Sequence, residues 1–101
     1  MLKFLQKFKT GDVINSPNNY RQSDGCRAGN HTAIVLKDTG KTEFVETLLI
    51  THSTAGTNVP LDFKKLKSEL WMPDAASQVT TDKFNSVRKN ARKRKGVQYD
   101  I

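Results

Sequence analysis

The chain has 101 residues, of which 36% are hydrophobic and 27% are charged, and its net charge is +7. This length predicts one domain over residues 1–101 and excludes two ordinary domains, and no apolar run approaches the roughly 18 residues that cross a bilayer. The lone cysteine, Cys26, excludes an internal disulfide and a multi-cysteine zinc site. Because lysines interrupt the apolar opening, we expect no secretory signal and a cytoplasmic protein. The excess of cations favours a polyanionic partner such as nucleic acid.

The first part of the chain predicts a short strand followed by a long loop. Residues 11–14 (Gly-Asp-Val-Ile) are typical of a turn that enters an apolar strand, and residues 15–30 are rich in Asn, Ser, Gly and Asp. Loops of this length are often functional. This one carries Tyr20, Arg21 and Arg27, which are side chains suited to stacking on bases and pairing with phosphates. An ordinary flexible surface loop is the equal alternative.

The middle of the chain predicts an antiparallel hairpin. Residues 31–36 (His-Thr-Ala-Ile-Val-Leu) are β-branched and apolar, residues 38–41 indicate a tight turn, and residues 42–52 predict a second, longer strand. After it, residues 60–63 indicate an edge strand or a turn, and residues 71–73 indicate a last short strand.

The C-terminal part predicts a basic helix. Thr81 is a suitable N-cap, Gly96 a suitable C-terminal stop, and Phe84, Val87 and Ala91 form a narrow apolar stripe. Six cations fill the last turns, among them Arg88 and Arg92, which we predict to bind RNA phosphates; a merely solvated helix face is the alternative. The predicted fold is therefore mainly β, a small twisted sheet or open barrel followed by a C-terminal helix (α+β).

The two histidines, His31 and His52, each lie at the outer end of one strand of the predicted hairpin. A turn centred on residues 39–40 would place His31 across from about Leu48, and both histidines would then face the same side of the sheet. Flat geometry would leave them roughly 13 Å apart, a gap that strong sheet curvature would have to close. The alternative is that either histidine simply ends a strand.

Two imidazoles at one site suit the cleavage of RNA without a metal or cofactor. One neutral histidine removes the 2′-OH proton, and a second, protonated histidine gives a proton to the departing 5′ oxygen, which leaves a 2′,3′-cyclic phosphate. An arginine of the long loop, Arg21 or Arg27, would stabilise the charge on the phosphorane. Ser53 and Thr54 offer further donors to phosphate.

The order of these segments resembles the MazF/PemK/Kid toxins. That family shows a G-D-[IVL] entry strand, a loop, an R-P-A-[IV]-V-L strand and a strand ending in P-[CVL]-T-[ST]; here residues 11–14, 31–36 and 48–53 take these places. The similarity extends over residues 8–62. It implies an SH3-like barrel, usually dimeric, and a metal-independent endoribonuclease that cuts single-stranded RNA and is neutralised by a cognate antitoxin.

The sequence departs from this family at the positions that carry its chemistry. The catalytic arginine of the family falls at or beside His31, Thr32 takes the place of its proline, and its catalytic threonine or serine falls near His52 and Ser53. The departure implies either ribonuclease chemistry with new acid–base groups, for which His31, His52, Ser53 and Arg27 are the candidates, or an inactive or repurposed relative.

Two alternative interpretations stay open, and a third is disfavoured by the position of the cysteine. Cys26 would be a nucleophile beside His31 only if the two side chains came within hydrogen-bond reach. A permuted papain-like hydrolase also shows Gly-Asp-Val-Ile and a strand-opening histidine, but it requires a cysteine after the histidine, and none follows His31. A non-enzymatic basic module that binds nucleic acid or an acidic protein is the main alternative to the enzyme.

Overall fold

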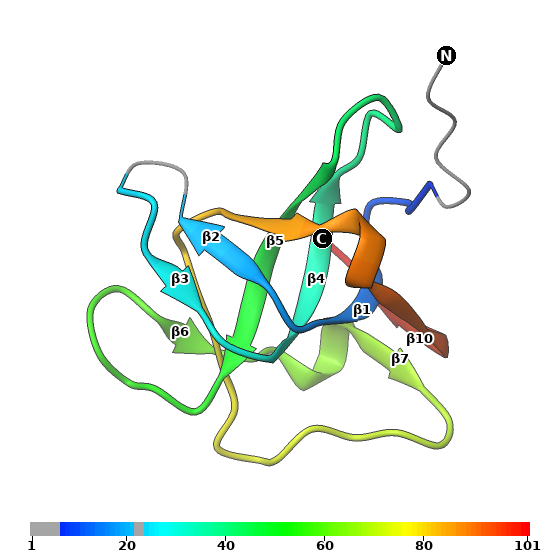
Figure 1. Ribbon diagram of the computed structural model, residues 1–101. Helices are drawn as coiled ribbons and strands as arrows, with labels where there is room; N and C mark the ends of the chain where they lie inside the picture. The colour runs from blue at the N-terminus through cyan, green and yellow to red at the C-terminus, as the bar shows by residue number, and fades with distance from the viewer. Residues whose placement is uncertain (1–6, 22–23) are drawn as a thin grey trace.

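An antiparallel sheet accounts for nearly all of the regular structure in residues 7–21 and 24–101, which this computed structural model describes (Figure 1). Neighbouring strands follow the order β3-β2-β9-β5-β4-β1-β10-β7, and β6 and β8 pair beside one end of β5. The elements are β1 (Asp12–Ser16), β2 (Asn19–Arg21), β3 (Arg27–Ala28), β4 (His31–Lys37), β5 (Phe44–Thr51), β6 (Val59–Pro60), η1 (Phe63–Lys65), β7 (Leu66–Ser68), β8 (Gln78–Val79), β9 (Phe84–Val87), η2 (Arg88–Asn90) and β10 (Arg92–Tyr99).

The predicted central hairpin is confirmed, but its register is not the predicted one. Strands β4 and β5 pair antiparallel, with Thr32 opposite Ile50 and Ile34 opposite Leu48. The connection is a wide loop over residues 38–43 rather than a tight turn, because the carboxylate of Asp38 accepts the N–H of Gly40 and is itself held by Arg88. The wider loop shifts β5, so His31 comes opposite Thr51 instead of Leu48.

The sheet is apolar on both faces, which explains the uninterrupted apolar run of β4. Successive strand residues point to opposite sides. Ala33 and Val35 accordingly belong to one core, with Phe84 and others, whereas Ile34 belongs to a second core with Ile50 and others. Two small cores therefore pack against β4 and β5, one on each face of the sheet.

The predicted C-terminal helix is wrong: residues 84–99 form β9, the short turn η2 and β10. Strand β9 lies between β2 and β5 and pairs with both, so backbone groups that would bond within a helix bond to two neighbouring strands instead. Its burial alternates, with Phe84 and Ser86 inside. The apolar stripe of three residues was too sparse to hold a helix against this pairing, because tertiary contacts override weak local propensity.

The mainly β prediction is confirmed, but the sheet does not close into a barrel. In the described chain, β3 and β7 end the strand order and do not pair with each other. The stretch predicted as a loop over residues 15–30 contains the end of β1 and the small hairpin β2–β3, and residues 71–73 form no strand. Among the described residues, no helix is long and apolar enough to span a membrane.

Gly11 joins the start of β1 to the ends of β4 and β10. Its N–H donates to the carbonyl of Val35, its carbonyl accepts the N–H of Tyr99, and its φ is 91°. A Cβ atom at this position would lie 2.6 Å from the carbonyl oxygen of Tyr99. Only glycine fits both this backbone conformation and this approach.

We therefore expect Gly11→Ala to lower the free energy of unfolding by about 2 kcal/mol or more, the scale of a strained left-handed residue. Urea unfolding monitored by Trp71 fluorescence measures the change. Gly29→Ala is the matched control, since an added Cβ meets nothing within 4 Å there. Equal unfolding midpoints for the two variants would contradict this account of Gly11.

Candidate functional site

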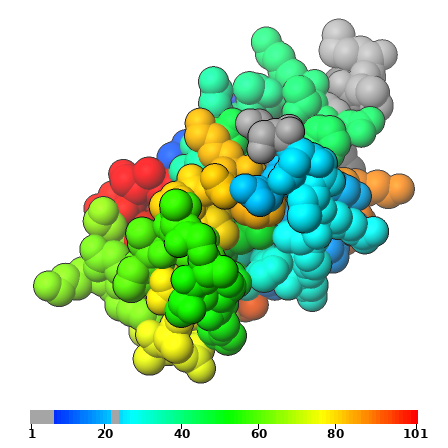
Figure 2. All heavy atoms as spheres, turned by 90° about the vertical axis from the view of Figure 1, so that its left-hand side faces the viewer, coloured from blue at the N-terminus to red at the C-terminus, as the bar shows by residue number. Residues whose placement is uncertain are grey.

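A hollow of about 450 Å³ lies where β4 begins and β5 ends. Its walls come from residues 30–32, residues 50–52 and parts of the segment 71–77. In Figure 2 the loop that follows β5 (green) and the segment that precedes β8 (yellow) lie side by side. A hollow of this size falls within the usual range of small-molecule and nucleotide sites.

His31 is half-buried in the wall of the hollow, as the first residue of β4. Its Nδ1 lies 3.2 Å from the carbonyl oxygen of Ile50. A carbonyl oxygen only accepts hydrogen bonds, so Nδ1 carries the proton in this contact. In the neutral ring this leaves Nε2 with a free lone pair, which is the form that a general base requires.

His52 lines the same hollow and is exposed, one residue beyond the end of β5. The predicted same-face relation of the two histidines along the ladder is wrong, because His31 comes opposite Thr51 and His52 is the next residue. The hollow nevertheless includes both side chains, since the regular strand has ended at Thr51 and the chain turns at His52. The two histidines are thus brought together by the strand end, not by strand parity.

Most of the residues that line the hollow were not among the predicted site residues, and three of them carry side chains suited to binding or polar chemistry. Trp71, Asp74 and Ser77 all line it, about 20 to 45 residues along the chain from the histidines. Trp71 packs against the second core, as its apolar character suggested, but it also borders the hollow. Nothing in the sequence links residues 71–77 to His31, because only the path of the chain after η1 carries them there.

Ser53 and Thr54 are exposed in the loop after β5 and lie outside the lining of the hollow as the described residues define it. The Oγ of Ser53 accepts the N–H of Ala55 at 3.2 Å, and its carbonyl accepts the side-chain amide of Asn58 at 3.0 Å. These contacts form the turn of the loop. The structure does not bring either hydroxyl to the histidines.

The aromatic and cationic residues of the predicted long loop are on β2 and β3. Arg27 donates to the side-chain oxygen of Asn18, and Arg21 pairs with Asp82 at 3.0 Å. Tyr20 is half-buried on β2. None of Tyr20, Arg21 and Arg27 is among the described residues that line the hollow. Cys26 is exposed in the same region, and it is not among the described residues that line the hollow with His31.

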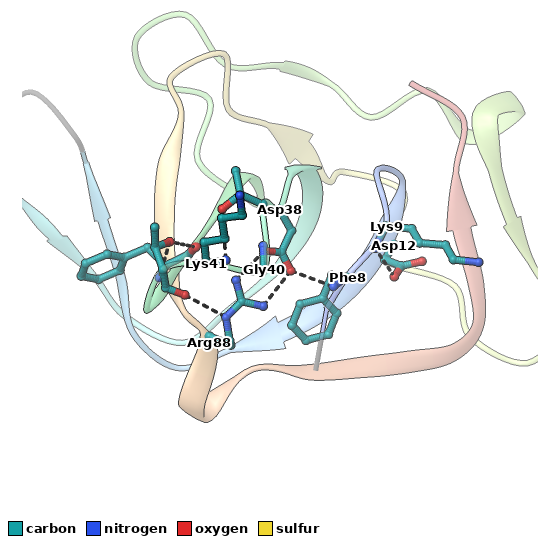
Figure 3. A network of polar contacts seen from close by, with 10 residues as sticks. Phe8, Lys9, Asp12, Asp38, Gly40, Lys41 and Arg88 are labelled. Atoms are coloured by element: carbon teal, nitrogen blue, oxygen red, sulfur yellow. Dashed lines mark hydrogen bonds and ion pairs between the residues drawn. The ribbon is translucent and has the colours of Figure 1, made fainter. Parts of the chain in front are cut away.

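Arg88 is buried, which contradicts its predicted role in binding RNA. Its side chain is 4% exposed and forms a two-pronged ion pair with Asp38, whose side chain is 0% exposed (Figure 3). Its Nε donates to the carbonyl of Thr42. This guanidinium fixes the loop between β4 and β5 from the inside and is not available to a phosphate.

The pKa of Asp38 lies below the ordinary aspartate value. Burial is the largest influence and by itself raises the pKa, but it is outweighed by hydrogen bonds from Arg88 and from the N–H groups of Phe8 and Gly40, together with the charge of Arg88. Asp38 is therefore the ionised centre of a structural network.

Cations are concentrated on the first half of β10 and on the segment η1–β7, whose strand β7 pairs with the second half of β10. Arg92 is exposed at the start of β10, as its predicted RNA-binding role requires, although it sits on a strand rather than on a helix. This basic edge is defined here as Lys64, Lys65, Lys67, Arg92, Lys93, Arg94 and Lys95. Lys93 is partly compensated by Asp12, at 3.5 Å.

Comparisons with known proteins leave the resemblance to the MazF/PemK/Kid toxins as a prediction. No family model matches the sequence, and neither the curated proteins nor the solved structures give a significant match. Over the residues that the structure describes, no three His, Cys, Asp or Glu side chains gather where they would hold a metal ion.

Proposed function

We propose that this protein is a toxin-like endoribonuclease that cleaves single-stranded RNA in the hollow lined by His31 and His52. The observation that carries the proposal is that the two histidines of the chain border one hollow, with Nδ1 of His31 tied to a backbone carbonyl. The chemistry needs two groups that change protonation near neutral pH, and imidazole is the side chain that does so.

In the proposed reaction, Nε2 of His31 removes the proton of a ribose 2′-OH. The 2′ oxygen attacks the adjacent phosphorus, and the bond from phosphorus to the 5′ oxygen of the next nucleotide breaks. Protonated His52 supplies the proton that the departing 5′ oxygen needs. The products are a 2′,3′-cyclic phosphate and a 5′-hydroxyl, with all of the acid–base work done by this chain's own residues.

The resemblance to the MazF/PemK/Kid toxins supports the wider proposal. This wider proposal includes an SH3-like fold, a cognate antitoxin, a second copy of the chain as a dimer partner, and action in the cytoplasm. The net charge of +7 and the basic edge supply the attraction for RNA that such an enzyme requires.

The direct test is to incubate the purified protein with a single-stranded RNA in the presence of a chelator and to identify the new ends. We expect fragments with a 2′,3′-cyclic phosphate and a 5′-hydroxyl, and no cleavage of the matching DNA, which lacks the 2′-OH. Intact RNA, or fragments with 3′-hydroxyl ends, would refute the proposal.

A second candidate function is a non-enzymatic RNA-binding module. It is favoured by the register of the hairpin, which denies the two histidines a shared face along the ladder, and by the basic edge, which needs no chemistry to bind phosphates. Such a module would bind RNA and leave it intact, and its affinity would be unchanged when His31 and His52 are both replaced.

A further inference from the structure

Trp71 joins the hollow to the basic edge. Its side chain lines the hollow, and the guanidinium carbon of Arg94 lies 4.3 Å from the centre of its ring. A guanidinium at this distance from an indole face is held by cation–π attraction and stacking. Arg94 is thus the cation of the basic edge that is fixed directly beside the wall of the hollow.

An irregularity of β10 places Arg94 there. Between two positions paired with β1, at Asp12–Gln98 and Ile14–Lys93, β1 advances by two residues and β10 by five. The extra residues bulge out of the ladder, and Gly96, with φ of 74°, allows the backbone to make this excursion. Bulges of this kind commonly redirect a side chain toward a site.

Among the residues that the structure describes, Arg94 has no carboxylate partner. Its Nε is shielded from solvent without a hydrogen-bond partner among those residues. A shielded donor of this kind is costly unless a ligand satisfies it. By contrast, Arg88 has its carboxylate partner inside the protein.

We propose that Trp71 and Arg94 form a phosphate subsite, which binds a phosphodiester of single-stranded RNA next to the nucleotide in the hollow. This inference rests on the proposed function and adds the group that positions the RNA strand. The planar guanidinium matches two phosphate oxygens, and the indole holds its plane in place. Lys95 and Lys67 are exposed on β10 and β7, two neighbouring strands (Figure 1), and add to the positive charge of the basic edge.

A single strand is the form of RNA that suits this arrangement. A hollow of about 450 Å³ has the size of a typical small-ligand site, and the unstacked bases of single-stranded RNA can enter such a site. Proteins that hold single strands typically combine an aromatic wall with a row of cations, as Trp71, Arg94 and Lys95 do here.

The test is fluorescence anisotropy with a labelled 2′-O-methyl oligonucleotide, which binds but cannot be cleaved through a 2′-OH. We expect Arg94→Ala to weaken binding about tenfold or more, since hydrogen bonds to charged groups are strong. The variant should also reduce the slope of log K against log salt by about 0.7, the share of one phosphate contact on a single strand. Arg94→Lys should keep most of the salt slope but lose affinity, because lysine lacks the planar fork.

Lys37→Ala is the matched control, an exposed cation at the far end of β4, and should bind like the wild type. Trp71→Phe, which retains an aromatic ring, should weaken binding less than Arg94→Ala does. Urea unfolding midpoints verify that each variant is folded. Equal oligonucleotide affinity and salt slope in the wild type and folded Arg94→Ala would overturn the subsite.

The binding assay and the cleavage test together separate failure of the subsite from failure of the enzyme. Oligonucleotide binding that depends on Arg94, together with intact natural RNA, would refute the endoribonuclease and uphold the subsite. Cleavage of natural RNA with binding that ignores Arg94 would refute the subsite and uphold the enzyme. A wild-type protein that binds no oligonucleotide would overturn the subsite outright.

Discussion

Replacing either His31 or His52 with alanine is expected to slow RNA cleavage by about 10²- to 10⁴-fold, the usual contribution of a positioned acid or base. Each replacement removes one proton transfer but leaves the basic edge intact. Affinity for an uncleavable oligonucleotide should therefore stay close to that of the wild type. Single-turnover cleavage rates and anisotropy titrations, measured on the same preparations, check both parts of the expectation.

Lys37→Ala again provides the control for this experiment, because it removes a cation from the far end of the strand that begins with His31. It should cleave RNA at the rate of the wild type. A double histidine variant that retained wild-type cleavage would show that the nuclease activity resides elsewhere in the protein.

Breaking the buried ion pair is expected to have the largest effect on stability. Arg88→Met leaves the carboxylate of Asp38 inside the protein without its cationic partner, and the loss of one member of a buried pair costs about 3–5 kcal/mol. That is a large fraction of the stability of a domain of this size. Urea unfolding of Arg88→Met measures it, with Arg92→Met as the control.

Arg92 is exposed and its side chain donates to the carbonyl of Ala91, the residue before it, so its replacement should change stability by less than about 0.5 kcal/mol. A difference of under about 1 kcal/mol between Arg88→Met and the wild type would contradict the structural role given to this ion pair.

The same network predicts how stability depends on pH. Because the pKa of Asp38 is lower in the folded protein than in the unfolded chain, ionisation of this group favours the folded state. This contribution is complete above about pH 4, the range in which an unfolded aspartate titrates, and is lost as the pH falls through the folded value. Asp38→Asn should be less stable at neutral pH, and its stability should fall less in acid. An equal fall in the free energy of unfolding of the wild type and of Asp38→Asn as the pH is lowered would contradict the prediction.

The fold was predictable where local pattern and tertiary pairing agree. The run His31–Leu36 is β-branched and apolar, and it forms the central strand because both of its faces are buried. Residues 84–95 could not be assigned from local pattern, because β9 buries the polar Ser86 beside Phe84 and therefore lacks the alternation of apolar and polar residues that marks a strand. The backbone bonds of β9 to β2 and β5 decide between a helix and a strand, and they depend on partners more than 35 residues away.

The residues of the candidate site also fall into two groups, those that local pattern predicts and those that depend on distant contacts. The histidines were found because each lies at the outer end of a predictable strand. Whether each cation is buried or exposed could not be predicted, since a run of Arg and Lys residues does not indicate which of them is buried. Arg88 pairs with Asp38, which lies 50 residues away in the sequence. Arg94 contacts Trp71 across a bulge of β10 that the sequence pattern does not predict.

If His31 and His52 act as base and acid on one phosphodiester, the two variants should respond differently to a change of leaving group. An RNA with sulfur in place of the scissile 5′ oxygen needs no proton to release its leaving group. On that substrate the cleavage rate of His52→Ala is expected to return close to the wild-type rate, while His31→Ala remains slow. Equal defects of both variants on the sulfur substrate, or no cleavage by the wild type, would contradict the account.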